Sequence, residues 1–519
     1  MTGRSWRLAD VFRDQANAVG AQPALTFDGE TLTFAMLDRH ANRVAHALLA
    51  EHVEPGDRIA TLTKNCSRFF EVLGGTAKAR ACLAPINFRL AAAEIAFILG
   101  DMAPRVLFVS REMSAVAQEA LARCAARPRM IVLDADMHDD TSYERWRAQG
   151  ADHDPQLQGD WEDDALLLYT SGTTGQPKGV RLTHRNYAAM LDAFPRVPGF
   201  TYGKGETIAN AMPLFHIAGI NVGMAGLSQG CCVWPISEFV PASLLKLIET
   251  ARVNHAFLAP AMISSLLQTP ASATTDFSSL VTIAYGAAPI AADVLERARR
   301  GFGCRFVQLY GMTESTGAGT YLDDASHSIP SKQGSCGVAW PGMRVRIVDA
   351  AGREVPAHQV GELIMSGDFV TPGYRNRTEA TAATLRDGWL HTGDAAYSDE
   401  DGYIFIHDRM KDMIVTGGEN VFPAEVENAI FGCPGVADVA VIGVPSEKWG
   451  EEVKAIVVPA PGAVIDAQRI IAWTKQRIAA YKAPKSVDFV AALPRNAAGK
   501  ILKRELRAPY WQGRSRQVN

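Results

Sequence analysis

Short apolar runs alternate with alanine-rich segments through the first third of the chain. The runs at 58–62, 106–109, 130–134 and 165–169 have the length and composition of buried strands. The alanine-rich segments between them are typical of helices. This alternation predicts an α/β fold. The polar stretch at 149–161 interrupts the pattern and is typical of a linker or a surface loop.

The pattern changes after the segment 401–415. The runs at 436–444 and 451–459 alternate like the two strands of a hairpin, and 466–480 has the pattern of a helix. This last part of the chain is about a hundred residues long, a size that can fold on its own. The sequence therefore predicts a compact final domain.

An uncharged stretch lies in the middle of the chain, from 207 to 237, and is long enough to span a bilayer. It also contains Asn210, Pro213, His216, Asn221 and four glycines, which would leave polar groups unpaired in lipid. We therefore expect buried strands and loops beside a functional site.

Composition excludes several classes of protein. At 519 residues, a prior of about one domain per 150 residues predicts two to four units. The net charge of -4 argues against a nucleic-acid binder, and the basic run at 296–305 is typical of a solvated helix end. The eight cysteines form no C-x-x-C pair, which supports neither a zinc site nor a disulfide framework and fits a reducing cytoplasm. The segment 1–16 predicts an amphipathic helix, not a signal peptide.

The loop "YTSGTTGQPKGV" at 169–180 follows an apolar run and combines glycines, four hydroxyl residues and one lysine. Backbone N–H groups of a glycine-rich turn suit phosphate oxygens, and hydroxyls and a lysine add donors and charge. The Walker loop does not match, because Lys178 precedes Gly179 and no hydroxyl residue follows it. A flexible surface loop is the alternative at this point.

Seven further stretches accompany this loop in order along the chain. They are "MPLFHIAG" (212–219), "YGAAP" (285–289), "QLYGMTE" (308–314), "GELIMSG" (361–367), "DGWLHTGD" (387–394), "DRMKDMIVTGGENVFPAEVE" (408–427) and "PRNAAGKILKREL" (494–506). Together they resemble the acyl-adenylate-forming superfamily, which includes acyl-CoA synthetases, adenylation domains of nonribosomal peptide synthetases and beetle luciferases. The resemblance covers nearly the whole chain.

The resemblance implies a fold and a reaction. The fold is α/β, with a large multi-subdomain N-terminal domain (1–408), a hinge (409–411) and a small mobile α+β C-terminal domain (412–519). The enzyme would join a carboxylic acid to ATP, release pyrophosphate, and pass the acyl group from AMP to the thiol of coenzyme A. The first step brings the anionic carboxylate to the polyanionic ATP. Cations and aligned hydrogen-bond donors must therefore offset the electrostatic repulsion between them.

The same resemblance assigns residues to ATP. The β- and γ-phosphates would contact Thr170, Ser171, Gly172, Thr173, Thr174, Gly175 and Lys178. Thr313 and Glu314 would lie at the α-phosphate, with Glu314 as the Mg²⁺ contact, since Mg²⁺ favours oxygen ligands. Asp394 would accept hydrogen bonds from the ribose, and Arg409 would reach the same region. The adenine slot would be formed by Tyr310, Gly286, Ala287, Ala288 and Pro289. A lone carboxylate is usually a cap or a solvated acid, but these motifs favour a site.

Other residues are assigned to the acid and to the thiol. His216 would position the acid, whereas a lone histidine on an apolar segment is more often a core residue. Lys500 would bridge the carboxylate and the α-phosphate, and Lys411 would be the pivot of the small domain. The pantetheine tunnel would be lined by the Gly417 and Gly418 loop and by Trp449, for which a buried core tryptophan is the alternative.

The acid and the acceptor are less well defined. The segments that line the family's acyl pocket, 207–237, 256–296 and 306–331, contain no lysine or arginine. A second carboxylate would be buried without a fixed partner, which is costly, so we expect a neutral fatty or aryl acid.

Three alternatives differ in function. The first is a stand-alone enzyme that loads a separate carrier protein. The second is a non-catalytic binding protein, which the complete set of motifs disfavours. The third, luciferase-like light emission, is remote. We expect no nucleic-acid partner and no transmembrane segment, and the oligomeric state stays open, a homodimer included.

Overall fold

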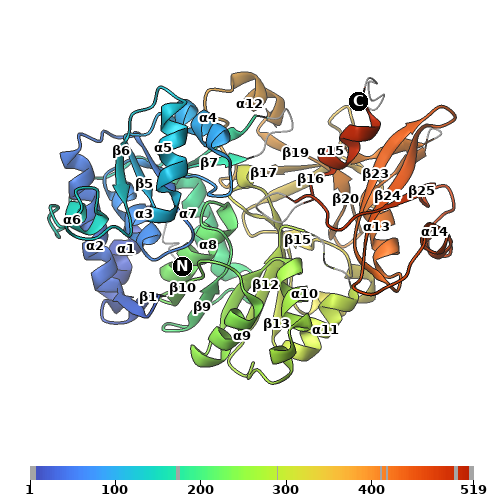
Figure 1. Cartoon of the computed structure of the whole chain (residues 1–519), viewed down its shortest axis with the longest axis horizontal. Coiled ribbons are helices and arrows are strands. Elements are labelled where there is room, and N and C mark those ends of the chain that lie inside the picture. Colours follow the sequence, from blue (N-terminus) through green and yellow to red (C-terminus); the bar gives the residue numbers. More distant parts are fainter. Residues whose placement is uncertain are drawn as a thin grey trace.

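The computed structural model describes residues 7–170, 176–288, 290, 292–409, 412–416, 419–495 and 501–512. Three sheets belong to the larger N-terminal part and a fourth to the C-terminal part, which lies against it (Figure 1). No helix in these ranges is long and apolar enough to cross a membrane.

The first sheet has six strands in the order β6-β5-β3-β4-β7-β8. All neighbours are parallel except β7 and β8, which form an antiparallel hairpin. One face packs on α2 and α3 and the other on α4 and α5. The bounds are β3 (Arg58–Leu62), β4 (Cys82–Pro85), β5 (Val106–Val109), β6 (Arg129–Val132), β7 (Asp164–Thr170), β8 (Lys178–Thr183), α2 (Phe34–Ala50), α3 (Arg68–Lys78), α4 (Ala92–Met102), α5 (Ser114–Ala122) and α6 (Tyr143–Arg147).

The second sheet has nine strands in the order β15-β14-β13-β12-β11-β9-β10-β1-β2. Helices α1 and α8 cover one face, and α9, α10 and α11 cover the other. The strands are β1 (Pro23–Phe27), β2 (Glu30–Thr33), β9 (Thr207–Asn210), β10 (Cys232–Pro235), β11 (His255–Leu258), β12 (Thr282–Gly286), β13 (Arg305–Gly311), β14 (Gly319–Leu322) and β15 (Val338–Ala339). The helices are α1 (Leu8–Val19), α7 (His184–Ala193), α8 (Ile217–Ser228), α9 (Pro241–Thr250), α10 (Pro260–Gln268) and α11 (Ala292–Phe302).

The third sheet is antiparallel and leads the chain to the C-terminal part. It contains β16 (Arg344–Val348), β17 (Gly361–Ser366), β18 (Leu385–Arg386), β19 (Trp389–Ser398) and β20 (Ile404–Arg409), with α12 (Thr378–Thr384) beside it. The fourth sheet contains β21 (Ile414–Thr416), β22 (Glu419–Val421), β23 (Val436–Ser446), β24 (Gly450–Pro459) and β25 (Ser486–Phe489). Helices α13 (Pro423–Phe431), α14 (Ala467–Lys475) and α15 (Lys503–Arg507) accompany it. This sheet has a core of its own.

Most sequence-based expectations for the elements are confirmed. The four apolar runs are strands β3, β5, β6 and β7, the late hairpin is β23 and β24, and the amphipathic N-terminal segment is α1. One expectation is wrong in part. The uncharged stretch at 207–237 is not only strands and loops, because its centre forms the buried helix α8. That helix is apolar on nearly every side, so no polar face marks it in the sequence. The proposed domain boundaries at 408 and 411 stay predictions.

Candidate active site

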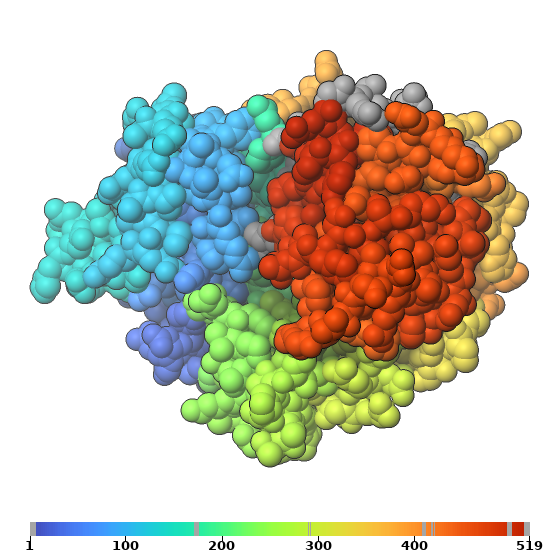
Figure 2. Space-filling model, turned by 45° about the vertical axis from the view of Figure 1, so that its right-hand side comes forward, coloured from blue at the N-terminus to red at the C-terminus, as the bar shows by residue number. Residues whose placement is uncertain are grey.

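A cavity of about 2240 Å³ lies where the C-terminal part meets the second sheet. Figure 2 shows the C-terminal residues, in orange and red, lying against the rest of the chain. Among the residues that line the cavity are Thr170, Lys178, His216, Thr313, Glu314, Tyr310, Ala287, Ala288 and Asp394. The cavity thus gathers residues from the predicted phosphate, adenine, ribose and acid sites.

The β7–β8 hairpin presents the predicted phosphate loop to the cavity. Thr170 pairs with Lys178 in the ladder, so the two ends of the loop face each other. The Lys178 ammonium lies 5.2 Å from the centre of the Tyr374 ring, and the Tyr374 hydroxyl donates a hydrogen bond of 2.9 Å to Glu314 Oε1. Tyr374 therefore links the phosphate loop to the predicted magnesium carboxylate. The loop's Ser171, Gly172, Thr173, Thr174 and Gly175 lie outside the described residues.

Thr313 and Glu314 lie in a turn directly after β13, and both are buried. Thr316, which ends this turn, has a φ of 54°, and its hydroxyl donates to the carbonyl of Phe369 at 2.6 Å. Tertiary contacts thus hold a turn that a β-branched residue disfavours. The described residues contain no group of three metal-ligating side chains. A Mg²⁺ ion would therefore take Glu314 from the chain and its other oxygens from phosphates and water.

The predicted ribose and adenine residues meet at the end of β13. The Tyr310 hydroxyl donates a hydrogen bond of 2.5 Å to Asp394 Oδ2. Burial and the Asp394 charge raise the pKa of Tyr310 well above its usual value, so the phenol keeps its proton. Arg409 pairs with Asp394 in the β19–β20 ladder, which places the backbones of the two residues side by side. At the end of the neighbouring strand β12, a Cβ atom at Gly286 would lie 2.4 Å from the Leu309 carbonyl oxygen.

Ala287 continues that turn in the left-handed region, with a φ of 67°. This conformation is uncommon for a residue with a Cβ atom, and it turns the chain away from β12 beside the cavity. Ala287 and Ala288 line the cavity, and Pro289 lies outside the described residues.

His216 caps the N-terminus of α8. Its Nδ1 accepts a hydrogen bond of 3.3 Å from the backbone N–H of Ala218, so the proton of the neutral ring is on Nε2. Burial lowers the pKa of His216 to about 4. The ring lies deep in the protein but keeps part of its surface uncovered because it lines the cavity. A neutral N–H donor at this place can orient an acid but cannot act as a base.

The cavity continues beside α8 as an apolar branch, which we call the acyl pocket. Strands β9, β11, β12 and β13 form one wall and α8 forms another. The described residues that these elements contribute to the lining include no lysine or arginine, and the lysines and arginines that line the cavity belong to other segments. The lining residues of this part include Phe194, Phe200, Tyr202, Ile208, Ala218, Val222, His255, Phe257, Ala284, Leu309 and Trp340.

The predicted site residues of the C-terminal part are only partly described. Lys411, Gly417, Gly418 and Lys500 lie outside the described residues, so their roles stay predictions. Asp412, next to the predicted pivot, pairs with Arg507 of α15 at 2.8 Å.

Trp449 lies in the turn between β23 and β24. Its side chain is 44% exposed, so the alternative of a buried core tryptophan is wrong. It does not line the cavity in this arrangement, where Lys448 packs over its ring at 4.7 Å, and its tunnel role stays a prediction.

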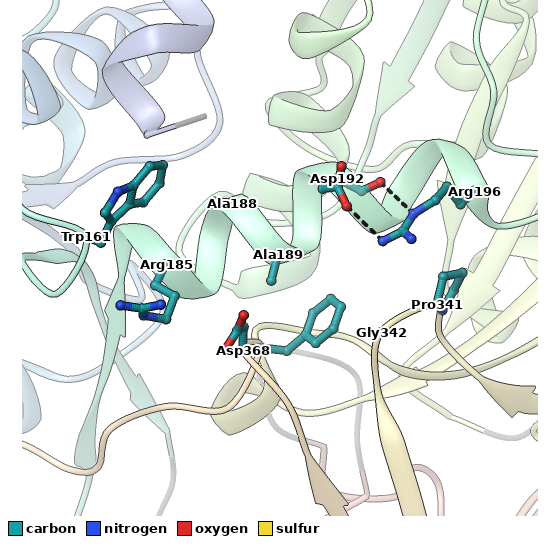
Figure 3. Close-up of a pocket in the computed structure, with 10 residues that line it drawn as sticks. Trp161, Arg185, Ala188, Ala189, Asp192, Arg196, Pro341, Gly342 and Asp368 are labelled. Atoms are coloured by element: carbon teal, nitrogen blue, oxygen red, sulfur yellow. Dashed lines mark hydrogen bonds and ion pairs between the residues drawn. The ribbon is translucent and has the colours of Figure 1, made fainter. Parts of the chain in front are cut away.

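A second, smaller pocket of about 390 Å³ is lined by α7 and by residues 341–342 and 368–369 (Figure 3). Both of its arginines already pair with carboxylates of the chain. Arg196 pairs with Asp192 at 2.8 Å, and Arg185 pairs with Glu162. The pocket contains none of the predicted phosphate, ribose or acid residues that line the larger cavity.

Sequence reasoning missed Tyr374 and the far end of the acyl pocket. Tyr374 is 60 positions from Glu314 along the chain, and only the tertiary structure brings them together. No local pattern around Tyr374 could have identified this contact.

Comparisons with known proteins establish the family. Residues 12–375 match the family described as AMP-binding enzyme, and residues 425–500 match the AMP-binding enzyme C-terminal domain. The fatty acid–[acyl-carrier-protein] ligase ScoC of Streptomyces coeruleorubidus is 39% identical over 96% of this chain and 95% of its own length. The feruloyl-CoA synthase of an Amycolatopsis species is 41% identical, over 94% of this chain and 96% of its own. ATP-bound MatB from Rhodopseudomonas palustris has a TM-score of 0.88 at 30% identity, covering 97% of this chain and 99% of MatB. The chain therefore belongs to the AMP-binding enzyme family and is an adenylate-forming enzyme of the acyl-CoA synthetase type.

Proposed function

We propose that the enzyme joins a neutral carboxylic acid to coenzyme A, with ATP as the energy source and acyl-AMP as the intermediate. The observation that carries the proposal is one continuous cavity in which Glu314 and Asp394 adjoin an acyl pocket free of lysine and arginine. An ATP site and an apolar acid site are the two components that this reaction requires.

The proposed mechanism begins with the acid in the acyl pocket and its carboxylate beside Thr313 and His216. The carboxylate oxygen attacks the α-phosphorus of ATP, and pyrophosphate leaves. Lys178 and the loop amides would stabilise the charge that develops on the leaving pyrophosphate, and Lys500 would stabilise the charge between the acid and the α-phosphate. A Mg²⁺ ion at Glu314 would neutralise phosphate charge.

Asp394 would hold the nucleotide by accepting hydrogen bonds from its ribose hydroxyls. The hydrogen bond from Tyr310 fixes one carboxylate oxygen before the nucleotide arrives. Positioning of this kind lowers the barrier because the reacting atoms need no further alignment. In the second step the thiolate of coenzyme A attacks the acyl carbon, and AMP leaves with the bonding electrons.

The proposal also specifies that the part of the acid beyond its reacting carboxylate is uncharged. Burying a second carboxylate in the acyl pocket would leave it without a cation among the described lining residues. The names of the relatives agree with fatty and aryl acids, since one is a feruloyl-CoA synthase and another a fatty acid ligase.

A second candidate differs in its acceptor. The relative ScoC is named for transfer to an acyl carrier protein and is 39% identical over nearly the full length. Under this alternative the adenylation step is unchanged, and the phosphopantetheine thiol of a carrier replaces coenzyme A.

The test is a panel of acids incubated with ATP and Mg²⁺ and with either coenzyme A or a holo-carrier protein. We expect pyrophosphate and thioester from hexanoate or benzoate with coenzyme A, and little product from malonate or succinate. Preference for the dicarboxylates would overturn the neutral-tail proposal. Thioester formation on the carrier alone would favour the second candidate. Glu314→Gln is the variant to compare with the wild type in the same assay, because it keeps the shape of the side chain and removes its charge.

A further inference from the structure

Asp394, the predicted ribose carboxylate, lies on an irregular part of strand β19. The ladder between β17 and β19 pairs Glu362 with Ala395 and Ile364 with His391. Two residue steps on β17 thus lie opposite four on β19, so the three residues between His391 and Ala395 form a β-bulge. A bulge bends its strand and can aim a side chain away from the ladder. Asp394, the last residue of this bulge, lines the cavity.

The side chain of Glu362 spans the bulge from the neighbouring strand. Its Oε2 accepts a hydrogen bond of 2.7 Å from His391 Nδ1, which carries a proton because a carboxylate only accepts. Its Oε1 accepts one of 3.1 Å from the backbone N–H of Gly393. Arg386 lies 3.5 Å from Oε2 on the exposed side. The Glu362 side chain is 22% exposed, so water can replace these contacts only in part.

Thr392 supplies the other support of the bulge. Its hydroxyl donates to the carbonyl of Leu363 at 2.7 Å and accepts from the backbone N–H of Asp394 at 3.0 Å. Gly393, between them, has a φ of 71°, a conformation that favours glycine. The extra residues of a bulge lose their ladder partners, and buried N–H groups need acceptors. Glu362 and Thr392 provide acceptors for the N–H groups of Gly393 and Asp394.

We propose that Glu362 is a positioning residue for the nucleotide, and that it acts on Asp394 through the N–H of Gly393. Glu362 itself does not line the cavity, so it has no direct contact with ATP in this assignment. The inference rests on the proposed function, because there the Asp394 carboxylate accepts hydrogen bonds from the ribose hydroxyls.

The backbone of Asp394 is then held from both neighbouring strands. On one side Asp394 pairs with Arg409 of β20, and on the other side Glu362 of β17 holds the residue that precedes it. The hydrogen bond from Tyr310 fixes only the end of the Asp394 side chain. Hydrogen bonds weaken steeply when donor and acceptor are misaligned, so a displaced bulge would lose affinity for the ribose although Asp394 is still present.

The experiment compares ATP with 2′,3′-dideoxy-ATP in the pyrophosphate-release assay, with the full-length enzyme and with hexanoate or benzoate as the acid. The dideoxy nucleotide lacks both hydroxyls that Asp394 would bind. For the wild type we expect kcat/KM to be at least about tenfold higher with ATP. In Glu362→Ala this ratio should fall at least about fivefold, mainly through a higher KM for ATP, because the dideoxy nucleotide has no ribose hydrogen bond to lose.

The ratio of two nucleotides on one preparation does not depend on the fraction of folded enzyme. Glu362→Gln is the conservative variant, since glutamine keeps an oxygen that can accept from the Gly393 N–H. Its ratio should stay within about threefold of the wild type. A role of Glu362 in stability alone would lower the amount of active enzyme and leave the ratio unchanged.

Glu206→Ala is the matched control. Glu206 also accepts from a glycine N–H, that of Gly203 at 2.6 Å, and it also contacts a histidine, His255, at 2.8 Å. It precedes β9 in the second sheet and does not line the cavity. This variant should keep the wild-type ratio, because any effect on the acid is the same with both nucleotides.

Three results would overturn the inference. They are a wild-type ratio below about threefold, a ratio in Glu362→Ala within about twofold of the wild type, and a ratio that falls as far in Glu362→Gln or Glu206→Ala as in Glu362→Ala. In each case pyrophosphate release with ATP leaves the proposed function intact. Absence of pyrophosphate with ATP and every acid would refute the proposed function itself.

Discussion

Removing the Tyr374 hydroxyl tests the contact that positions Glu314. Tyr374→Phe keeps the ring on which the Lys178 ammonium lies and deletes the oxygen that donates to Glu314 at 2.9 Å. A hydrogen bond to a charged group contributes about 1.5–3 kcal/mol, and a tenfold change corresponds to about 1.4 kcal/mol. We therefore expect kcat/KM for ATP to fall by about 10- to 100-fold. Glu314 is 7% exposed, so water replaces the lost donor only in part.

The assay is pyrophosphate release at a saturating concentration of acid, with Mg²⁺ varied. The half-saturating Mg²⁺ concentration should rise in Tyr374→Phe, because the Glu314 carboxylate is less well oriented. Tyr143→Phe is the matched control, since the Tyr143 hydroxyl donates to the buried Glu71 carboxylate at 2.9 Å in the first sheet's core. It should cost stability without changing the Mg²⁺ dependence. An unchanged Mg²⁺ dependence in Tyr374→Phe would refute the positioning role.

Three further predictions concern the adenine turn, the two lysines and pH. Gly286→Ala should raise the KM for ATP by at least about tenfold in a steady-state assay, because the new Cβ atom would lie 2.4 Å from the Leu309 carbonyl oxygen; an unchanged KM would contradict this packing. Lys500→Ala should slow acyl-AMP formation by about 10²–10³-fold and spare thioester formation from supplied acyl-AMP, whereas Lys411→Pro should do the reverse, as separate half-reaction assays would show. The unfolded chain binds a proton at His216 below pH 6.5 but the folded protein does so only near pH 4, so the melting temperature should fall as the pH drops between these values, and less steeply in His216→Asn.

The apolar pattern was sufficient to predict many of the strands. Runs such as 58–62 and 106–109 are short, wholly apolar and bounded by polar residues, so their period and length leave few alternatives. Helix α8 could not be recognised in the same way. It is buried on almost every side, and a helix without a polar face has no period that separates it from a strand.

The candidate site was predictable where residues lie within contiguous motifs. Thr313 and Glu314 are adjacent in the sequence, and the structure places both at the cavity. Tyr374 could not be found from the sequence, because its role depends on a contact with a distant segment.

The stoichiometry of products tests the proposed reaction most directly. The purified enzyme would be incubated with hexanoate or benzoate, ATP, Mg²⁺ and coenzyme A, and all nucleotides and thioesters would be quantified by mass spectrometry. We expect equal amounts of AMP, pyrophosphate and acyl-CoA, and enzyme-bound acyl-AMP when coenzyme A is omitted. Formation of ADP and phosphate, or of acyl-CoA without AMP, would contradict the proposed acyl-AMP mechanism.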